Sequence, residues 1–528
     1  MNLTKSLILS ISTFVLLTGC GGGSGSDSLV ATALEKKEKL SLANVWFDAG
    51  VNYVEKKDLE TFISTRGSAK NIILFVGDGM GLSTVTAARI LDGQNRGESG
   101  EENMLSFDKF PVAGLSKTYN SDSQTPDSAG TMTAMMTGVK TKKGVLSISE
   151  TVNRADCAGT TGHEVVTALE LAEDIGKSTG IVSTARLTHA TPAATYAHTA
   201  DRNWENNSKL PDGSTCKDIA AQLIDFSYGD GIDVAMGGGR REFMPNNAPE
   251  VEGKSGKRTD GRDLRDEWKA KYPTGSYVET LADFNAVPAN ATKLFGLFNY
   301  SHMQYEADRA NDVAGEPSLT QMTQKAVSIL SKNTKGFFLM VESGRIDHAH
   351  HAGNAYGALS DTIEMAKAVA KADEMTSDND TLIIVTADHS HVFTIAGYPK
   401  RGNPILGKVQ GTDAHGIAKT EDALAADGLA YTTLGYANGR GFMNLGAETD
   451  SDAGYGVDIH KGRADLTNID TKTPGYHQEA TVPLSSETHA GEDVGIYAKG
   501  PGAQLLSGVN EQNMIFHVME HMGNLVKK

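Results

Sequence analysis

Short runs of consecutive hydrophobic residues recur along the chain, and each ends abruptly in a polar turn. The clearest runs cover residues 71–76, 179–183, 336–341 and 381–386. Continuous apolar runs, in contrast to alternating ones, are typical of strands buried on both faces of a parallel sheet. Helical patterns over 164–175 and 359–376 separate some of them. The pattern therefore predicts the α/β fold class, with a large, mostly parallel sheet sandwiched between helices.

Each predicted strand is followed by side chains that can bind metal or take part in catalysis. They are Asp78 after the first run, His189 and Thr191 after the second, Glu342 after the third, and Asp388 and His389 after the fourth. In open parallel sheets, ligands bind outside the carboxyl ends of the strands. We therefore expect these side chains, far apart in sequence, to meet along one edge of the sheet.

The region from about 397 to 485 has a different composition. It is rich in Gly, Asp and Thr and contains few long apolar runs. We interpret it as an insertion that caps or extends the core.

The net charge of the chain limits the kinds of molecule that it is expected to bind. The 528 residues include 49 basic and 66 acidic side chains, which gives a formal net charge of −17. Such an acidic chain argues against nucleic acid as the main partner. It would also repel an anionic substrate at long range, so a phosphate site would need a strong local positive centre, such as bound metal ions.

The first residues have the pattern of an export signal. Lys5 precedes a mostly apolar stretch at 7–17 that is too short to span a membrane. The sequence Leu-Thr-Gly-Cys that ends at Cys20 resembles the bacterial lipoprotein processing box. We therefore expect a signal peptide at 1–19, a lipidated Cys20 and a flexible tether within 20–41, which would anchor the exported protein to a membrane in the periplasm or at the cell surface. An ordinary signal peptide with an incidental cysteine is the alternative.

Two further cysteines, Cys157 and Cys216, complete the cysteine inventory. In an exported protein such a pair favours a disulfide bond. Two buried free thiols are the alternative interpretation.

Several His and acidic residues have spacings that suit a metal ion. Asp347 and His351 are four residues apart and would share one face if they open a helix, and zinc accepts both ligand types. Asp388 and His389 can face one ion only if the chain has already left the strand. The segment 347–351 could also be a solvated His-rich turn. His489 is a further candidate ligand, and its alternative interpretation is a hydrogen-bonded structural histidine.

Ser128 precedes a helix-like run that stops at Gly138. One interpretation is a simple N-cap. The other is a nucleophile at a helix N-terminus, where free N–H groups and the helix dipole stabilise a bound phosphate. Serine needs a base or a metal to react, and the neighbouring sequence supplies no base. Arg202 could bind two phosphoryl oxygens, although a surface arginine is the more ordinary interpretation.

Six segments resemble, in order, the motifs of the alkaline phosphatase family. They are NIILFVGDGMG, TPDSAGT, HATPAATYAHTADRNW, VESGRIDHAHHAGN, TADHSHVF and ETHAGEDV. Six motifs in register are far more specific than any one of them. The resemblance implies a catalytic domain over 42–528 that hydrolyses phosphate monoesters to an alcohol and inorganic phosphate.

The resemblance also implies a role for each matching residue. Ser128 matches the nucleophile that becomes a phosphoserine, and Arg202 matches the arginine that binds the substrate phosphate. The implied ligand sets are Asp347, His351 and His489 for one zinc ion, Asp78, Asp388 and His389 for a second, and Asp78, Thr191 and Glu342 for a third metal, usually magnesium. The family therefore implies two Zn²⁺ and one Mg²⁺ per chain.

Some positions vary within the family. His189 and His348 stand where the enteric bacterial enzyme has acidic and lysine residues, which makes this chain similar to animal and some marine bacterial members. The missing acidic residue at position 189 leaves the identity of the third metal open. Asp127, next to the matched nucleophile, is a further candidate for the substrate side of the site. The 397–485 insertion resembles the crown region through which family members form homodimers.

Two alternative functions have recognisable signatures. A sulfatase would place its nucleophile in a Cys/Ser-x-Pro-x-Arg context, and phosphodiesterases of the superfamily usually lack the matching arginine and the third metal site. A catalytically inactive surface lipoprotein that binds metal or a partner would have lost a nucleophile or a ligand. Ser128 is not in the sulfatase context, and every matched catalytic position is retained.

Overall fold

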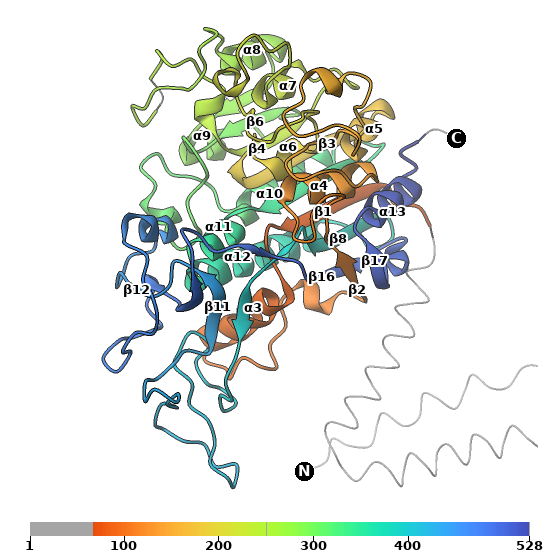
Figure 1. Cartoon of the computed structure of the whole chain (residues 1–528). Helices are drawn as coiled ribbons and strands as arrows, with labels where there is room; N and C mark the ends of the chain where they lie inside the picture. Colours follow the sequence, from red (N-terminus) through yellow and green to blue (C-terminus); the bar gives the residue numbers. More distant parts are fainter. Residues whose placement is uncertain (1–66, 250, 527–528) are drawn as a thin grey trace, which may run out of the picture. The chain divides into compact units, whose positions relative to one another are not determined.

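A ten-stranded sheet forms the centre of the protein (Figure 1). The computed structural model describes residues 67–249 and 251–526, which belong to one compact unit, Thr61–Lys528. In spatial order the strands are β17 (Gly508–Glu511), β2 (Val112–Lys117), β16 (Val494–Lys499), β8 (Thr381–Ala387), β1 (Asn71–Gly77), β7 (Phe337–Ser343), β3 (Ser178–Arg186), β4 (Val234–Gly238), β6 (Leu294–Leu297) and β5 (Ser276–Val278). The strands from β8 to β5 run parallel, whereas β16 is antiparallel to both of its neighbours. The predicted fold class is confirmed.

Helices cover both faces of this sheet, and β1 shows why its sequence has no polar alternation. Ile73 and Phe75 point into one hydrophobic core, whereas Ile72 and Leu74 point into the other. The helices that pack in the first core are α3 (Leu82–Asn95), α10 (Leu319–Leu330) and α12 (Ala355–Met375). Those in the second are α4 (Ser128–Thr137), α5 (Ala168–Asp174), α7 (Ile219–Asp225), α8 (Leu264–Lys271) and α13 (Met514–Gly523). Each core-facing aliphatic side chain contributes about 1.5–3 kcal/mol by leaving water.

The four strands that the apolar runs predict are β1, β3, β7 and β8, but the helix predicted over 164–175 begins later. Its N-cap is Thr167, whose hydroxyl accepts a hydrogen bond from Glu170 N at 3.1 Å, while the Glu170 carboxylate accepts one from Thr167 N at 2.8 Å. This capping box starts α5 at Ala168. The apolar pattern does not reveal this start.

The 397–485 region, all of which the structure describes, contributes no strand to the ten-stranded sheet. Its strands β11 (Leu434–Gly439) and β14 (Ala480–Pro483) form a separate small sheet with β10 (Phe393–Ile395). A second pair joins β12 (Met443–Asn444) to β13 (Tyr476–His477). The region runs from cyan to blue in Figure 1. Its limits, like the start of the catalytic domain at 42, remain predictions.

Cys157 and Cys216 form a disulfide bond, so the predicted pairing is confirmed. The signal peptide at 1–19, the lipidated Cys20 and the tether at 20–41 lie outside the described residues. Within the described part of the chain, none of the helices has the length and hydrophobicity needed to cross a bilayer.

Candidate metal centre and active site

Three carboxylates meet where neighbouring strands end. Asp78 follows β1, Glu342 is near the end of β7, and Asp388 follows β8. Because β1 lies between β7 and β8, these side chains converge, and all three are completely buried. The chain turns tightly at Gly79, whose φ is +70° and whose N–H donates to Asp388 Oδ1 at 3.0 Å. A side chain at Gly79 would collide with the ring of His391, so glycine is required there.

A second group forms around Asp347 on α11 (Arg345–His351). His351 Nε2 and His489 Nε2 lie 3.4 Å and 3.2 Å from Asp347 Oδ1. The Nδ1 atoms of His351 and His489 lie 2.7 Å and 2.9 Å from the carbonyl oxygens of Glu487 and Pro126. A carbonyl can only accept, so each Nδ1 carries a proton, and in the neutral ring this leaves the Nε2 lone pair free for a metal. One carboxylate and two imidazole lone pairs are a donor set that suits zinc.

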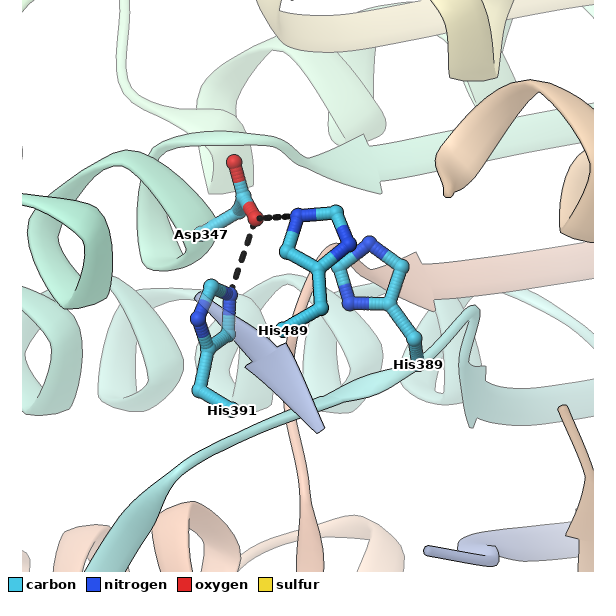
Figure 2. A group of neighbouring side chains, drawn as sticks. All are labelled: Asp347, His389, His391 and His489. Atoms are coloured by element: carbon cyan, nitrogen blue, oxygen red, sulfur yellow. Dashed lines mark hydrogen bonds and ion pairs between the residues drawn. The ribbon is translucent and has the colours of Figure 1, made fainter. Parts of the chain in front are cut away.

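His389 joins this group to the carboxylates. Its Nε2 lies 3.2 Å from Asp388 Oδ2 and 3.4 Å from Asp78 Oδ1. Its ring stacks on that of His489 (Figure 2), and the two ring centroids are 3.6 Å apart. Asp78, Asp388 and His389 place one ligand atom each within 4.8 Å of one another. Because β8 ends at Ala387, the chain has left the strand before Asp388 and His389, as convergence on one ion requires.

A third group contains Asp78, Glu342 and His189, whose ligand atoms also lie within 4.8 Å of one another. Thr191 Oγ1 donates to Asp78 Oδ2 at 3.5 Å, and Ser183 Oγ donates to Glu342 Oε2. Glu342 Oε1 is buried and has no hydrogen-bond partner among the described residues. A buried carboxylate oxygen without a donor is suited to a cation.

The charge balance supports the same conclusion. Burial, together with the repulsion of neighbouring carboxylates, raises the pKa of Asp78 well above its ordinary range. Burial also raises the pKa of Asp388, and it raises that of Glu342 to about 7. These acids can ionise together at low cost only if positive charge lies between them, and metal ions would supply it. The residues therefore fit a group of bound metal ions.

Ser128 is the first residue of α4, and its predicted alternative role as the N-cap is wrong. Asp127 is the N-cap, and its Oδ1 accepts from Gly130 N at 3.2 Å. Ser128 Oγ points toward the carboxylate groups and lies 3.2 Å from His389 Nε2 and 3.4 Å from Asp78 Oδ1. The predicted end of the helix is confirmed, because Gly138 caps it in the left-handed conformation with φ +76°.

Arg202 contacts the residue that precedes this serine. Its Nη1 donates to Asp127 Oδ2 at 3.0 Å, and its Nη2 lies 3.1 Å from His189 Nε2. Burial opposes ionisation of Asp127, but Arg202 together with hydrogen bonds from Gly144 N and Gly130 N outweighs it and lowers the pKa of this carboxyl. The helix cap therefore also orients the guanidinium.

His348 lies near His189 and Arg345, at the edge of the site. Its Nδ1 accepts from Arg345 Nη1 at 3.2 Å, and its ring centroid lies 5.5 Å from that of His189. Burial lowers the pKa of His348 to about 3 and that of His189 well below its ordinary value. Both rings are therefore neutral at neutral and alkaline pH. The sequence analysis did not single out His302, whose ring centroid lies 4.1 Å from that of His348.

His391 and Glu487 are further members of the site that the sequence analysis missed. His391 Nε2 lies 2.8 Å from Asp347 Oδ1, and its Nδ1 lies 2.6 Å from Glu487 Oε2 (Figure 2 draws the first of these contacts). Burial lowers the pKa of His391, but the two carboxylates outweigh it and raise the pKa to about 10. The only local signal is position, since His391 follows His389 by two residues and Glu487 precedes His489 by two.

The open α/β sheet, the buried ligand groups and the serine next to them together are typical of a metal-binding hydrolase. Residues 69–525 match the family model described as alkaline phosphatase. The human tissue-nonspecific alkaline phosphatase isozyme is 46% identical over 465 residues, which cover 86% of this chain and 83% of that protein. The alkaline phosphatase of the cod Gadus morhua is 44% identical over 467 residues, which cover 86% and 92%. The chain belongs to the alkaline phosphatase family.

Solved structures share the fold. The Thermus thermophilus alkaline phosphatase superposes with a TM-score of 0.61 at 24% identity and covers 88% of this chain and 93% of its own. A cold-active alkaline phosphatase from Shewanella sp. gives a TM-score of 0.57 at 24% identity and covers 87% and 100%.

Proposed function

We propose that the chain hydrolyses phosphate monoesters by way of a phosphoserine on Ser128. The observation that carries the proposal is the position of Ser128 Oγ, 3.2 Å from His389 Nε2 and 3.4 Å from Asp78 Oδ1, at the start of α4. Ser128 Oγ loses its proton and forms a bond to phosphorus as the ester P–O bond breaks, and the leaving alkoxide takes up a proton. Water then attacks phosphorus, the Ser128 Oγ–P bond breaks, Ser128 Oγ takes a proton from the attacking water, and inorganic phosphate leaves.

We infer three metal positions from the ligand groups. They are a zinc ion at Asp347, His351 and His489, a second zinc ion at Asp78, Asp388 and His389, and a magnesium ion at Asp78, Thr191 and Glu342. Oxygen ligands favour magnesium at the third position, and His189 lies in the same group. When bound, such ions supply Lewis-acid stabilisation for oxygen atoms that carry negative charge during phosphoryl transfer.

The protein's own groups would hold the phosphoryl oxygens. Arg202, oriented by Asp127, offers guanidinium N–H donors, and the N-terminus of α4, where Ser128 stands, favours a bound anion. Most of the rate enhancement would come from positioning and charge stabilisation. These contacts recognise the phosphoryl group and not the alcohol, so we expect broad selectivity among small phosphate monoesters.

We further propose that the chain is exported, anchored to a membrane through lipid on Cys20, and dimeric through the 397–485 insertion. Exposed apolar side chains in that insertion support the last point, since Tyr398 is 93% exposed and Ile417 and Leu424 are each 65% exposed. Surfaces of this kind are typical of protein interfaces. The membrane anchor rests on the sequence at residues 17–20.

The test is hydrolysis of a chromogenic phosphate monoester at alkaline pH by the purified chain. We expect chelation to abolish turnover and added zinc and magnesium to restore it. Replacement Ser128→Ala should lower kcat/KM on the order of 10³-fold or more, as loss of a nucleophile does in serine hydrolases. Turnover of diesters or sulfate esters but not monoesters would overturn the proposed reaction. A metal-replete protein that turns over nothing would favour the inactive lipoprotein.

A further inference from the structure

Glu487 makes an unusual number of contacts beside the first ligand group. Its side chain is buried, and Oε1 accepts from Val392 N at 2.9 Å while Oε2 lies 2.6 Å from His391 Nδ1. Its backbone carbonyl accepts from His351 Nδ1 at 2.7 Å, and its N–H donates to His351 O at 3.0 Å. One residue therefore holds two of the imidazoles that surround Asp347.

The side-chain contact continues to the candidate ligand Asp347. The His391 ring lies between two carboxylates, with Nδ1 2.6 Å from Glu487 Oε2 and Nε2 2.8 Å from Asp347 Oδ1. This ring fixes the rotation of the Asp347 carboxylate, whose Oδ1 also faces His351 and, as Figure 2 shows, His489.

The protein contains a matched pair that lacks this connection. Glu170 is equally buried, its Oε2 accepts from Thr167 N at 2.8 Å, and its Oε1 lies 2.7 Å from His198 Nε2. The other nitrogen of His198 contacts the carbonyl oxygen of Ser147 at 2.9 Å. The far nitrogen therefore faces a candidate metal ligand in one Glu–His pair and a backbone carbonyl in the other, and only Glu487 also approaches a candidate ligand directly, with Oε2 3.6 Å from His351 Nδ1.

We propose that Glu487 is a positioning residue that sets the zinc affinity of the group formed by Asp347, His351 and His489. It acts through His391, which holds Asp347 in the orientation that a metal needs. The inference rests on the ligand assignment of the proposed function. Loss of an outer-shell partner of this kind costs roughly 10–100-fold in metal affinity.

The experiment compares Glu487→Ala and Glu487→Gln with Glu170→Ala and Glu170→Gln in the full chain. Zinc affinity is measured by competition with a chelator of known affinity, and thermal stability is recorded for each metal-free variant. Cobalt(II) substitution provides a second readout, because its visible spectrum reports the ligand geometry. The backbone contact of residue 487 to His351 remains in each variant, so the comparison isolates the carboxylate.

We expect Glu487→Ala to weaken one zinc site about 10- to 100-fold and to change the cobalt spectrum. Glu487→Gln should weaken it less, because the amide can still pair with His391 Nδ1. At saturating zinc, Glu487→Ala should regain most of its kcat. The Glu170 variants should lose stability but keep wild-type zinc affinity.

Two results would overturn the inference in different ways. If Glu487→Ala binds zinc as tightly as the wild type while losing as much stability as Glu170→Ala, Glu487 is a structural residue only. If the wild type itself binds no zinc, the ligand assignment of the proposed function fails and the inference fails with it. Measuring the wild type first separates these cases.

Discussion

Asp347 and Asp78 are both buried carboxylates that follow neighbouring strands, yet their pKa values shift in opposite directions. Burial disfavours the charged form of both. Around Asp347, His351, His391 and His489 outweigh burial and hold its pKa well below the ordinary range. Around Asp78, the neighbouring carboxylates add to burial and raise its pKa well above that range.

The comparison extends to the two halves of the site. In the imidazole half, around Asp347, the protein supplies positive charge through His391, whose pKa of about 10 keeps it protonated. In the carboxylate half, Asp78, Asp388 and Glu342 are packed together, and burial raises the pKa of each. The imidazole half is therefore partly neutralised by its own residues, whereas the carboxylate half depends on cations from solution.

The largest expected effect follows from Asp78, which contributes to two ligand groups at once. Asp78→Asn should lower kcat/KM by more than about 100-fold, the upper range for loss of an outer-shell partner of a metal. It should also lower the number of metal ions bound per chain. Steady-state kinetics and metal analysis of the purified variant test this.

Asp233→Asn is the matched control. Asp233 belongs to another acidic group, with Glu173 and Asp230. It precedes β4 and therefore lies at the amino ends of the parallel strands, whereas Asp78 lies at their carboxyl ends. Its replacement should leave kcat/KM close to wild type. Equal losses in both variants would contradict the assignment of the ligands to the Asp78 edge.

The next effect concerns pH and the metal-free protein. Burial raises the pKa of Glu342 from 4.5 to about 7, so the folded state holds a proton that the unfolded state releases. The stability linked to this group is fully present below pH 4.5 and is lost as pH rises to about 7. The glutamine of Glu342→Gln cannot titrate. Across this pH window the free energy of unfolding of the metal-free variant should therefore rise by about 3 kcal/mol relative to that of the metal-free wild type.

Urea unfolding of chelated protein at pH 5 and pH 8 measures this difference. In the metal-loaded protein the sign should reverse, because Gln is the poorer ligand. An identical pH dependence for wild type and variant, both metal-free, would refute the contrast between the two halves.

The smallest effect lies behind the imidazole half. Tyr436 Oη is 2.8 Å from His350 Nδ1, and His350 Nε2 is 2.9 Å from Thr84 Oγ1. Tyr436→Phe leaves a buried nitrogen without a partner and should lower the free energy of unfolding by about 1–3 kcal/mol. Zinc affinity should stay at the wild-type value, because none of these groups contacts Asp347. Thermal unfolding and chelator competition measure the two quantities, and weakened zinc binding would show that the contact reaches the metal site.

Local sequence was enough to determine the central strands and the family. The runs at 71–76, 179–183, 336–341 and 381–386 predict β1, β3, β7 and β8 because a strand buried on both faces needs apolar side chains at every position. The convergence of Asp78, Glu342 and Asp388 followed from the rule that parallel strands end at one edge. The common face of Asp347 and His351 followed from their spacing of four, but the helix that this requires, α11, was left open by the sequence.

Tertiary structure alone decided the details that control charge. The contacts of His391 with Asp347 and Glu487 join segments far apart in the chain, and no local pattern encodes them. Asp127 and Ser128 are both residue types that can cap a helix, so the sequence alone permits either one. The backbone geometry of the folded chain makes Asp127 the N-cap. The opposite pKa shifts of Asp78 and Asp347 arise from burial and neighbouring charges, which exist only after the strands and α11 have packed together.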